Sequence, residues 1–261
     1  MITSRQNQKI KRVKQLTSQA KFRKKGNAYV VEGIRLLEEA LQADQLPELI
    51  LYAPDLDRRG QTLVKIFQDQ QVTCELTAQD VLNTASDTEN SQGVVAVFPI
   101  DPLPMPNQME LVLIIDEIRD PGNLGTLMRS SLAAGVDLLL LSPGTVDQYS
   151  PKVIRSGMGA HFRLPVISAS WEEIRDITSG LPLYLADMNE GESCWETDLT
   201  SPLGIILGGE ANGPGDISRE LAHQSIHIPM NTYSESLNAA AAGAVLLFEI
   251  RRQRHLQKQS G

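Results

Sequence analysis

The sequence has few of the residues that mark a disulfide-stabilised, metal-binding or membrane protein. Its 261 residues include two cysteines, Cys74 and Cys194, which form no Cys-x-x-Cys pair. The four histidines show no ligand spacing, because His223 and His227 lie in a stretch that alternates like a strand. There is no signal peptide and no apolar run of the ~18 residues that span a membrane. We therefore expect a soluble, cytoplasmic protein that works without a metal ion or a membrane partner.

Lysine is absent from residues 203–249, although this stretch contains a glycine-rich turn. A P-loop would need a lysine there, and the dinucleotide pattern Gly-x-Gly-x-x-Gly is missing as well. The glycines instead let a ligand approach the main chain closely, which suits a flat heterocycle as well as a phosphate. A second apolar run ends at Ile228, and a helical stripe starts at Leu237 with Ser234 or Ser236 available as N-cap. Two loops and a helix start are therefore expected to form a pocket.

Acidic residues are missing from residues 1–26, which hold nine lysines and arginines. The rest of the chain contains 15 basic and 32 acidic residues, a net charge of −17 against −8 for the whole sequence. A basic arm on an acidic body indicates contact with a polyanion. A mitochondrial transit peptide has a similar composition, but this arm runs without a break into the strand-like Tyr29–Val31.

Alternating strand and helix patterns predict two α/β domains. Residues 1–98 form the first, which opens with a helix over Ser4–Ala20 whose apolar edge is Ile10, Val13 and Leu16. Four prolines then fall within 99–108 and predict a stiff linker. Residues 109–261 form the second domain.

The second domain repeats the order strand, helix, which predicts a mostly parallel sheet covered on both faces. Its first strand, Leu111–Ile115, is fully apolar, and Asn123 is expected to cap the helix Leu124–Ala134. Ligands of such sheets bind beyond the carboxyl ends of the strands. Those ends are predicted at residues 116–123, 208–215 and 229–236.

Three ordered motifs at these strand ends resemble those of the SpoU (TrmH-type) RNA 2′-O-ribose methyltransferases, a branch of the SPOUT superfamily. They are Asp120–Arg129, Leu207–Gly213, and Ile228–Met230 with Ser236–Asn238. The resemblance covers the whole second domain. The first 98 residues resemble the RNA-binding domain, related to small ribosomal proteins, that many members carry. The fold implied is α/β, with a parallel-sheet SPOUT domain that contains a deep trefoil knot.

The resemblance also implies S-adenosylmethionine as cofactor, a homodimer with the site at its interface, and a role for each motif residue. The methyl-transfer site would comprise Asn123, Arg129, Glu210, Ser236 and Asn238. The cofactor contacts would come from Gly208, Gly209, Ile228, Met230, Ser236, Leu237 and Asn238. With such a domain behind the basic arm, the RNA contacts are expected from Arg5, Lys9, Lys11, Arg12, Lys14, Arg23, Lys24 and Lys25. Because a guanidinium stays protonated in proteins, Arg129 is expected to grip a phosphate rather than act as a base.

The function implied is methyl transfer from S-adenosylmethionine to an RNA ribose hydroxyl, and the extra domain favours ribosomal RNA of the 23S type. Transfer RNA, or a ribosomal nucleotide that binds an antibiotic, is an alternative substrate that the sequence does not separate. A non-catalytic RNA-binding or ribosome assembly factor with the same fold is a further alternative. The intact set of five transfer-site side chains argues against it.

Overall fold

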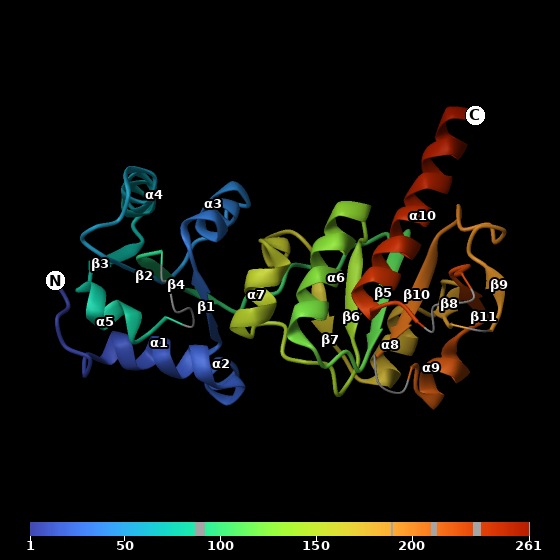
Figure 1. The fold of residues 1–261 in the computed structure, drawn as a ribbon, viewed down its shortest axis with the longest axis horizontal. Coiled ribbons are helices and arrows are strands. Elements are labelled where there is room, and N and C mark those ends of the chain that lie inside the picture. Colours follow the sequence, from blue (N-terminus) through green and yellow to red (C-terminus); the bar gives the residue numbers. More distant parts are fainter. Residues whose placement is uncertain (87–91, 189, 210–212, 232–235, 261) are drawn as a thin grey trace. The chain divides into compact units, whose positions relative to one another are not determined.

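The computed structural model describes residues 1–86, 92–188, 190–209, 213–231 and 236–260 (Figure 1). The chain divides into two compact units. The first is Met1–Asp101 with Asp147–Phe162, and the second is Pro102–Val146 with Arg163–Gly261.

The first unit is built around a four-stranded sheet in the order β1-β4-β2-β3. The strand β4 is antiparallel to both of its neighbours, whereas β2 and β3 are parallel. The elements are α1 (Gln8–Ser18), α2 (Ala20–Gly26), β1 (Ala28–Glu32), α3 (Ile34–Gln42), β2 (Leu49–Tyr52), α4 (Arg58–Asp69), β3 (Thr73–Leu76), α5 (Gln79–Asn83) and β4 (Val94–Pro99), followed by α7 (Pro151–Gly157) and the 3-10 helix η1 (Ala160–Phe162).

Helices cover both faces of this sheet because alternate residues of each strand point to opposite sides. On β4, Val95 and Val97 pack with the helix α1, whereas Ala96 and Phe98 pack with α3 and α4. Ile10, Val13 and Leu16 are the buried residues of α1, as the sequence predicts. The helix expected over Ser4–Ala20 is wrong in extent, since Gln19 adopts an extended conformation and separates α1 from α2.

The segment Asp147–Phe162 packs into the first unit, although the sequence placed it within residues 109–261. Its aromatic side chains join that unit's core: the rings of Tyr149 and Tyr29 lie 4.9 Å apart, and those of Phe162 and Phe98 lie 5.3 Å apart. His161 is buried beside them and its Nε2 lies 2.7 Å from the carbonyl oxygen of Gln148. Burial lowers the pKa of His161 to about 4, so this imidazole is neutral at physiological pH.

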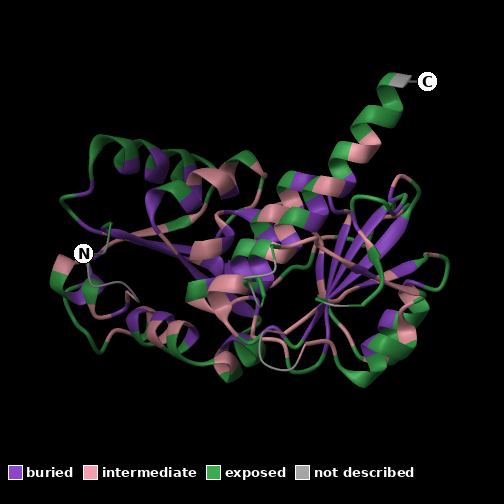
Figure 2. Cartoon of the chain, turned by 45° about the vertical axis from the view of Figure 1, so that its right-hand side comes forward, coloured by how far each residue is buried: buried purple, intermediate pink, exposed green. Residues whose placement is uncertain are grey.

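The second unit is a parallel seven-stranded sheet in the order β7-β6-β5-β10-β8-β11-β9. Its elements are β5 (Leu111–Asp116), α6 (Pro121–Ala134), β6 (Leu138–Leu141), β7 (Val166–Ser168), α8 (Trp171–Ile177), β8 (Leu183–Ala186), β9 (Glu192–Ser193), β10 (Leu203–Gly208), α9 (Asp216–Leu221), β11 (Gln224–His227) and α10 (Ala239–Ser260). The strands β5, β6 and β10 are buried along nearly their whole length (Figure 2). That burial confirms the covered parallel sheet expected from their continuous apolar runs.

Helices α6 and α10 lie side by side on one face of this sheet (Figure 1), and α8 packs on the opposite face. Gly243 permits the close approach of α10 to α6, since a Cβ there would lie 2.4 Å from Cδ2 of Leu127. Ser170 and Glu173 form a capping box at the start of α8. No helix of the described residues has the length and apolarity to span a membrane.

Candidate active site

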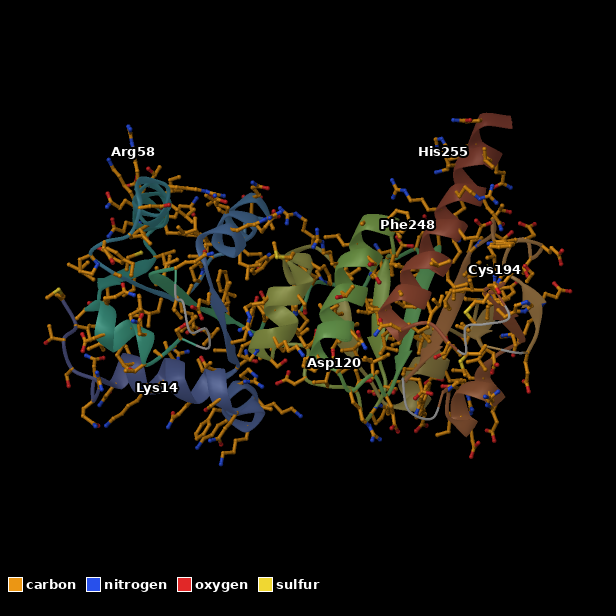
Figure 3. The ribbon with its side chains drawn as sticks, in the orientation of Figure 1. Lys14, Arg58, Asp120, Cys194, Phe248 and His255 are labelled. Carbon is orange, nitrogen blue, oxygen red and sulfur yellow. The ribbon has the colours of Figure 1, made fainter. Side chains whose placement is uncertain are left out.

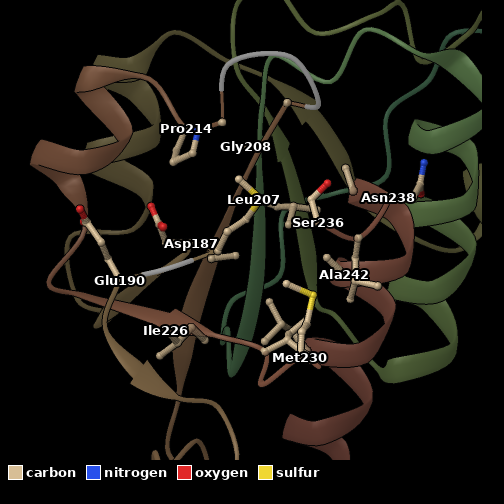
Figure 4. A pocket seen from close by; sticks show the side chains of 18 of the residues that line it. Asp187, Glu190, Leu207, Gly208, Pro214, Ile226, Met230, Ser236, Asn238 and Ala242 are labelled. Atoms are coloured by element: carbon tan, nitrogen blue, oxygen red, sulfur yellow. The ribbon is translucent and has the colours of Figure 1, made fainter. Parts of the chain in front are cut away.

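A pocket of about 720 Å³ opens at the carboxyl ends of β8, β10 and β11, next to the start of α10 (Figure 4). This is the edge of the sheet at which the sequence predicts a ligand site. The residues that line it are Ala186, Asp187, Met188, Glu190, Leu207, Gly208, Gly209, Gly213, Pro214, Arg219, Ile226, Ile228, Met230, Ser236, Leu237, Asn238, Ala239, Ala242 and Leu246.

All seven residues predicted to contact the cofactor line this pocket. Those after β11 and before α10 come from one loop, and the glycines come from the end of β10. Five of these residues are glycines or apolar, so hydrogen bonds from them to a ligand have to come from the main chain, whereas Ser236 and Asn238 also have polar side chains. The structure therefore brings this predicted set together, while its binding role stays a prediction.

The glycine-rich turn packs backbone against backbone. A Cβ on Gly208 would lie 2.3 Å from the nitrogen of Pro214, and one on Gly209 would lie 2.7 Å from the carbonyl oxygen of Glu117. Any larger residue at either position would displace the turn, because distances below ~3 Å are well inside van der Waals contact.

The buried carboxylate of Asp116 holds the far end of this turn. Its Oδ2 accepts a hydrogen bond of 2.7 Å from the Gly215 amide and another of 2.7 Å from the Ser218 hydroxyl. Asp116 is the last residue of β5, and only 4% of its surface is exposed. The end of β5 is thereby fixed to the start of α9. The sequence placed Asp116 at a strand end but gave it no role.

Asn123 and Asn238 link the two helices beside the pocket. The Nδ2 group of Asn238 donates a 3.0 Å hydrogen bond to Oδ1 of Asn123, 115 positions away in the chain. The Oδ1 atom of Asn238 accepts from the amides of Ala240 and Ala241, so Asn238 caps α10. The predicted cap at Ser234 or Ser236 is therefore wrong for Ser236, and Ser234 lies outside the described residues.

The predicted capping role of Asn123 is also wrong. Helix α6 starts at Pro121, and Asp120 is its N-cap (Figure 3). The Asp120 carboxylate accepts a hydrogen bond of 2.9 Å from the backbone N–H of Asn123. Proline at the first helical position and an acidic cap before it suit a helix N-terminus better than the later start inferred from the sequence. The Asn123 side chain is thereby available to Asn238.

The remaining residues of the predicted transfer site differ in their relation to the pocket. Arg129 lies on α6 two turns beyond Asn123, is exposed, and does not line the pocket. Ser236 lines the pocket and is exposed. Glu210 lies outside the described residues, so its predicted role stays untested.

A charged corner that the sequence did not single out lies across the pocket from Ser236 and Asn238 (Figure 4). A nitrogen of the Arg219 guanidinium is 3.2 Å from Oδ2 of Asp187 and 3.6 Å from Oε2 of Glu190. Asp187 directly follows β8. Its position at the carboxyl end of a parallel strand is the signal that could have marked it.

The basic residues of 1–26 differ in what they can bind. Arg23 is 5% exposed, and its guanidinium lies 2.6 Å from Oδ2 of Asp147 and donates to the carbonyl oxygen of Leu16. This burial makes Arg23 part of the first unit's core, which conflicts with the RNA contact expected of it.

Three other residues of the arm form surface ion pairs. Arg5 pairs with Asp80 at 3.5 Å, Arg12 with Glu48 at 2.6 Å, and Lys9 with Glu75. The hydrogen bond from Lys9 lowers the pKa of the Glu75 carboxyl. No ion pair holds the side chains of Lys11, Lys14, Lys24 or Lys25 within the part of the chain that the structure describes. These four, together with the exposed Lys21, are the cations of the arm that the described ion pairs leave available.

No group of three or more histidine, cysteine, aspartate or glutamate side chains that could hold a metal ion occurs among the described residues. What the pocket offers a ligand is main chain, apolar side chains and the charged corner. Such a lining suits an organic molecule with an apolar ring and several hydrogen-bonding groups.

Comparison with known proteins gives two family matches. The model of the SpoU rRNA Methylase family matches residues 110–248, and that of the MRM3-like substrate binding domain matches residues 7–96. The chain is 31% identical to the 23S rRNA (guanosine(2553)-2'-O)-methyltransferase RlmP of Bacillus subtilis, over 96% of this chain and 98% of that protein. It is 30% identical to the mitochondrial rRNA methyltransferase 3 of Mus musculus, over 89% of this chain and 69% of that one.

Among solved structures, the chain is similar to the SpoU methyltransferase AviRb from Streptomyces viridochromogenes in complex with the cofactor AdoMet. The TM-score is 0.84 at 25% sequence identity, with 98% of this chain and 100% of that chain covered. The resemblance inferred from the three motifs is thereby confirmed, and so is the α/β fold with its parallel sheet.

Proposed function

The chain belongs to the SpoU rRNA methylase family, and we propose that it transfers the methyl group of S-adenosylmethionine to a ribose 2′-hydroxyl of 23S-type ribosomal RNA. The observation that carries the proposal is the pocket at the carboxyl ends of β8, β10 and β11, beside the Asn123–Asn238 pair. Relatives named for ribosomal RNA 2′-O-methylation and the AdoMet-bound AviRb structure support it.

The pocket residues fit S-adenosylmethionine. The volume of about 720 Å³ lies within the usual range of small-molecule sites. Leu207, Ile226 and Ile228 offer an apolar wall for the adenine ring, and the glycines leave main-chain groups within reach of its ring nitrogens. Asp187, Glu190 and Arg219 add charged side chains to one corner of this lining.

When bound, the cofactor supplies a methyl group that its sulfonium already activates, so the protein needs mainly to position the ribose. Asn238 caps α10 and donates a hydrogen bond to the Asn123 side chain at the start of α6. We infer that this amide pair and Ser236 orient the ribose hydroxyl, and that Glu210 assists. Positioning of this kind contributes up to roughly 7–11 kcal/mol in ideal intramolecular systems.

Arg129 is proposed to grip an RNA phosphate beside the target ribose. Its exposed position on α6, on the same helix as Asn123, suits a group that meets the substrate rather than the cofactor. A guanidinium forms bidentate hydrogen bonds to phosphate and stays protonated, so the 2′-hydroxyl proton must leave to another acceptor.

The first unit is proposed to bind RNA through the available cations of its arm. Lys11, Lys14, Lys24 and Lys25 lie on α1 and α2, where α2 has three basic residues in its last turn. A match to a substrate binding domain over residues 7–96 supports this assignment.

We also propose that the reaction takes place in the cytoplasm, in line with the bacterial relatives.

The proposal includes a homodimer and a trefoil knot. Val245, Phe248 and Leu256 are exposed apolar residues whose spacing places them on one side of α10, and a second copy is proposed to cover them. Phe248 is labelled in Figure 3. The knot stays a prediction, because residues 210–212 and 232–235 of its two loops lie outside the described residues.

The test is transfer of labelled methyl from S-adenosylmethionine to unmodified 23S ribosomal RNA, with transfer RNA as the comparison. One alkali-resistant nucleotide in the ribosomal RNA is expected, since a 2′-O-methyl group blocks alkaline cleavage. Labelling of transfer RNA instead would show that transfer RNA, not ribosomal RNA, is the substrate. Absence of both transfer and cofactor binding would favour a non-catalytic RNA-binding protein.

A further inference from the structure

The charged corner of the pocket, Asp187 with Arg219 and Glu190, has no role in the transfer mechanism. We propose that Asp187 recognises the vicinal hydroxyls of the cofactor's adenosine ribose, with Arg219 as the residue that orients its carboxylate. This inference rests on the proposed function, because it names a subsite of the same cofactor pocket.

The position of Asp187 places its carboxylate at a ligand-binding edge. Asp187 follows the last residue of β8, and its amide donates a 3.0 Å hydrogen bond to the carbonyl oxygen of Ile226 on β11. The main chain of Asp187 is thus fixed at the carboxyl ends of two parallel strands. In dinucleotide-binding folds, an acidic residue near a strand end serves the same purpose, by accepting hydrogen bonds from ribose hydroxyls.

The Asp187 side chain is less exposed than that of Glu190 and lies closer to Arg219. The Asp187 side chain is 11% exposed and takes the closer of the two contacts with Arg219. Glu190 is 70% exposed and lies farther from the same guanidinium. Asp187 is therefore the better preorganised acceptor.

The net charge of the corner favours a hydrogen-bond donor as its ligand. Two carboxylates face one guanidinium, so the corner carries an excess negative charge and would repel the methionine carboxylate of the cofactor. The donors of the cofactor are the ribose hydroxyls, the α-ammonium group and the adenine amine.

The residues beside the corner favour the ribose hydroxyls over the α-ammonium group and the adenine amine as its ligand. Ile226 pairs with Ala186 across β11 and β8, so the apolar wall offered to the adenine ring is directly beside Asp187. The ribose is the group attached to adenine. The methyl group has to face Ser236 and Asn238 on the other side of the pocket (Figure 4), and the ribose lies between the adenine and that sulfonium.

The experiment compares binding of S-adenosylhomocysteine with binding of its 2′-deoxy and 3′-deoxy forms, measured by calorimetry on the full chain. The wild-type protein is expected to bind the parent compound roughly 10- to 100-fold more tightly than at least one deoxy form, the range for a hydrogen bond to a charged group. Asp187→Ala should lose that preference and bind the deoxy form about as well as the wild type does. A role in folding alone would weaken all three ligands equally.

Glu190→Gln is the matched control, because Glu190 faces the same guanidinium from an exposed position. It should keep the wild-type preference to within about threefold, as expected for an exposed ion pair. Asp187→Asn, which preserves the shape, covers the case in which Asp187→Ala does not fold. It should reduce the preference and leave the melting temperature close to that of the wild type.

Two results would overturn the inference without touching the proposed function. One is an undiminished preference for the parent compound in both Asp187 variants. The other is a loss in those variants of discrimination against a form that lacks the α-amino group, which would assign the corner to the ammonium. Failure of the wild-type protein to bind S-adenosylhomocysteine at all would instead contradict the proposed function.

Discussion

At the residue scale, the site depends on a few side chains whose partners lie far along the chain. Asp116 bonds to Ser218 across 102 positions, and Asn123 bonds to Asn238 across 115. Each of these bonds joins distant segments beside the pocket, so its loss should lower ligand affinity. One substitution below tests the bonds of Asp116, and another tests the exposed Arg129 on α6.

Replacement of Arg129 by lysine separates RNA binding from turnover. A lysine keeps the positive charge but not the bidentate hydrogen bonds of the guanidinium, so the phosphate would be attracted but poorly oriented. We expect RNA affinity to fall less than about tenfold, since the change affects one phosphate at most. Turnover should fall by about 100-fold, as for other misalignments at a reacting centre. Single-turnover kinetics with saturating RNA measure the effect, and near-normal turnover would defeat the assigned role.

Replacement of Asp116 by asparagine should loosen the glycine-rich turn. The bonds from Gly215 and Ser218 both end on Oδ2, so an amide oxygen in its place would accept them without the negative charge, which weakens each bond by about 1 kcal/mol. We expect the dissociation constant for S-adenosylhomocysteine to rise by about tenfold, as measured by calorimetry. Ser218→Ala removes a single bond and should have the smaller effect. An unchanged affinity in Asp116→Asn would show that the turn is held by other contacts.

At the element scale, the helix α2 combines two kinds of basic residue on adjacent positions. Arg23 is buried and anchors Asp147, whereas Lys24 and Lys25 are exposed in the same last turn. The position on the helix, not the residue type, decides which cation is structural and which is available to RNA. Neighbouring substitutions should therefore have opposite consequences.

Neutralising Lys24 and Lys25 to glutamine should weaken RNA binding and leave stability unchanged. For each phosphate that a lysine no longer neutralises, the slope of log affinity against log salt should become shallower by roughly 0.7–0.9. Filter binding at several salt concentrations measures this slope, and calorimetric unfolding provides the stability. A salt slope equal to that of the wild type would remove these two lysines from the RNA surface.

Replacing Arg23 by glutamine should instead lower stability and leave RNA binding unchanged, because it leaves the carboxylate of Asp147 without its cation. Breaking a buried pair from one side typically costs about 3–5 kcal/mol. The Asp147 side chain is partly exposed, so the lower end of that range is expected. Chemical unfolding of the full chain would measure the decrease in stability, and a change below about 1 kcal/mol would mean that solvent replaces the pair.

At the scale of the whole molecule, α10 carries the exposed apolar side chains Val245, Phe248 and Leu256, to which the proposed dimer interface is assigned. Phe248 is 48% exposed, although it belongs to a helix whose other face is buried against α6. Large exposed aromatic side chains in such a stripe are typical of interfaces between copies. A charge placed there should oppose association, because it would be buried without a partner.

Phe248→Asp is therefore expected to convert a dimer into a monomer, as measured by light scattering after size-exclusion chromatography. Ile66→Asp is the matched control, since Ile66 is also an exposed apolar residue but lies on α4 in the first unit. The control should keep the wild-type mass. A wild-type protein that is monomeric at micromolar concentration would refute the proposed dimer, and a dimeric Phe248→Asp variant would place the interface elsewhere.

Local pattern in the sequence determined much of the fold. The continuous apolar run of β5 and the period of Ile10, Val13 and Leu16 on α1 depend on neighbours within a few positions, and the structure confirms both. The order of the three motifs likewise identified the family, because each motif is a short contiguous stretch. Helix boundaries were less reliable, as the wrong start assigned to α6 shows.

Only the tertiary structure decided which of the predicted residues lie together and which of them are exposed. Nothing in the sequence around Arg23 separates it from Lys24, since its burial results from Asp147, 124 positions away. The charged corner likewise forms because β8 and α9 converge, so that Asp187 meets Arg219 from 32 positions along the chain. The sequence by itself thus determined the elements, the family and the glycine-rich turn. Contacts between distant segments, which carry no local periodicity, decided the geometry of the site.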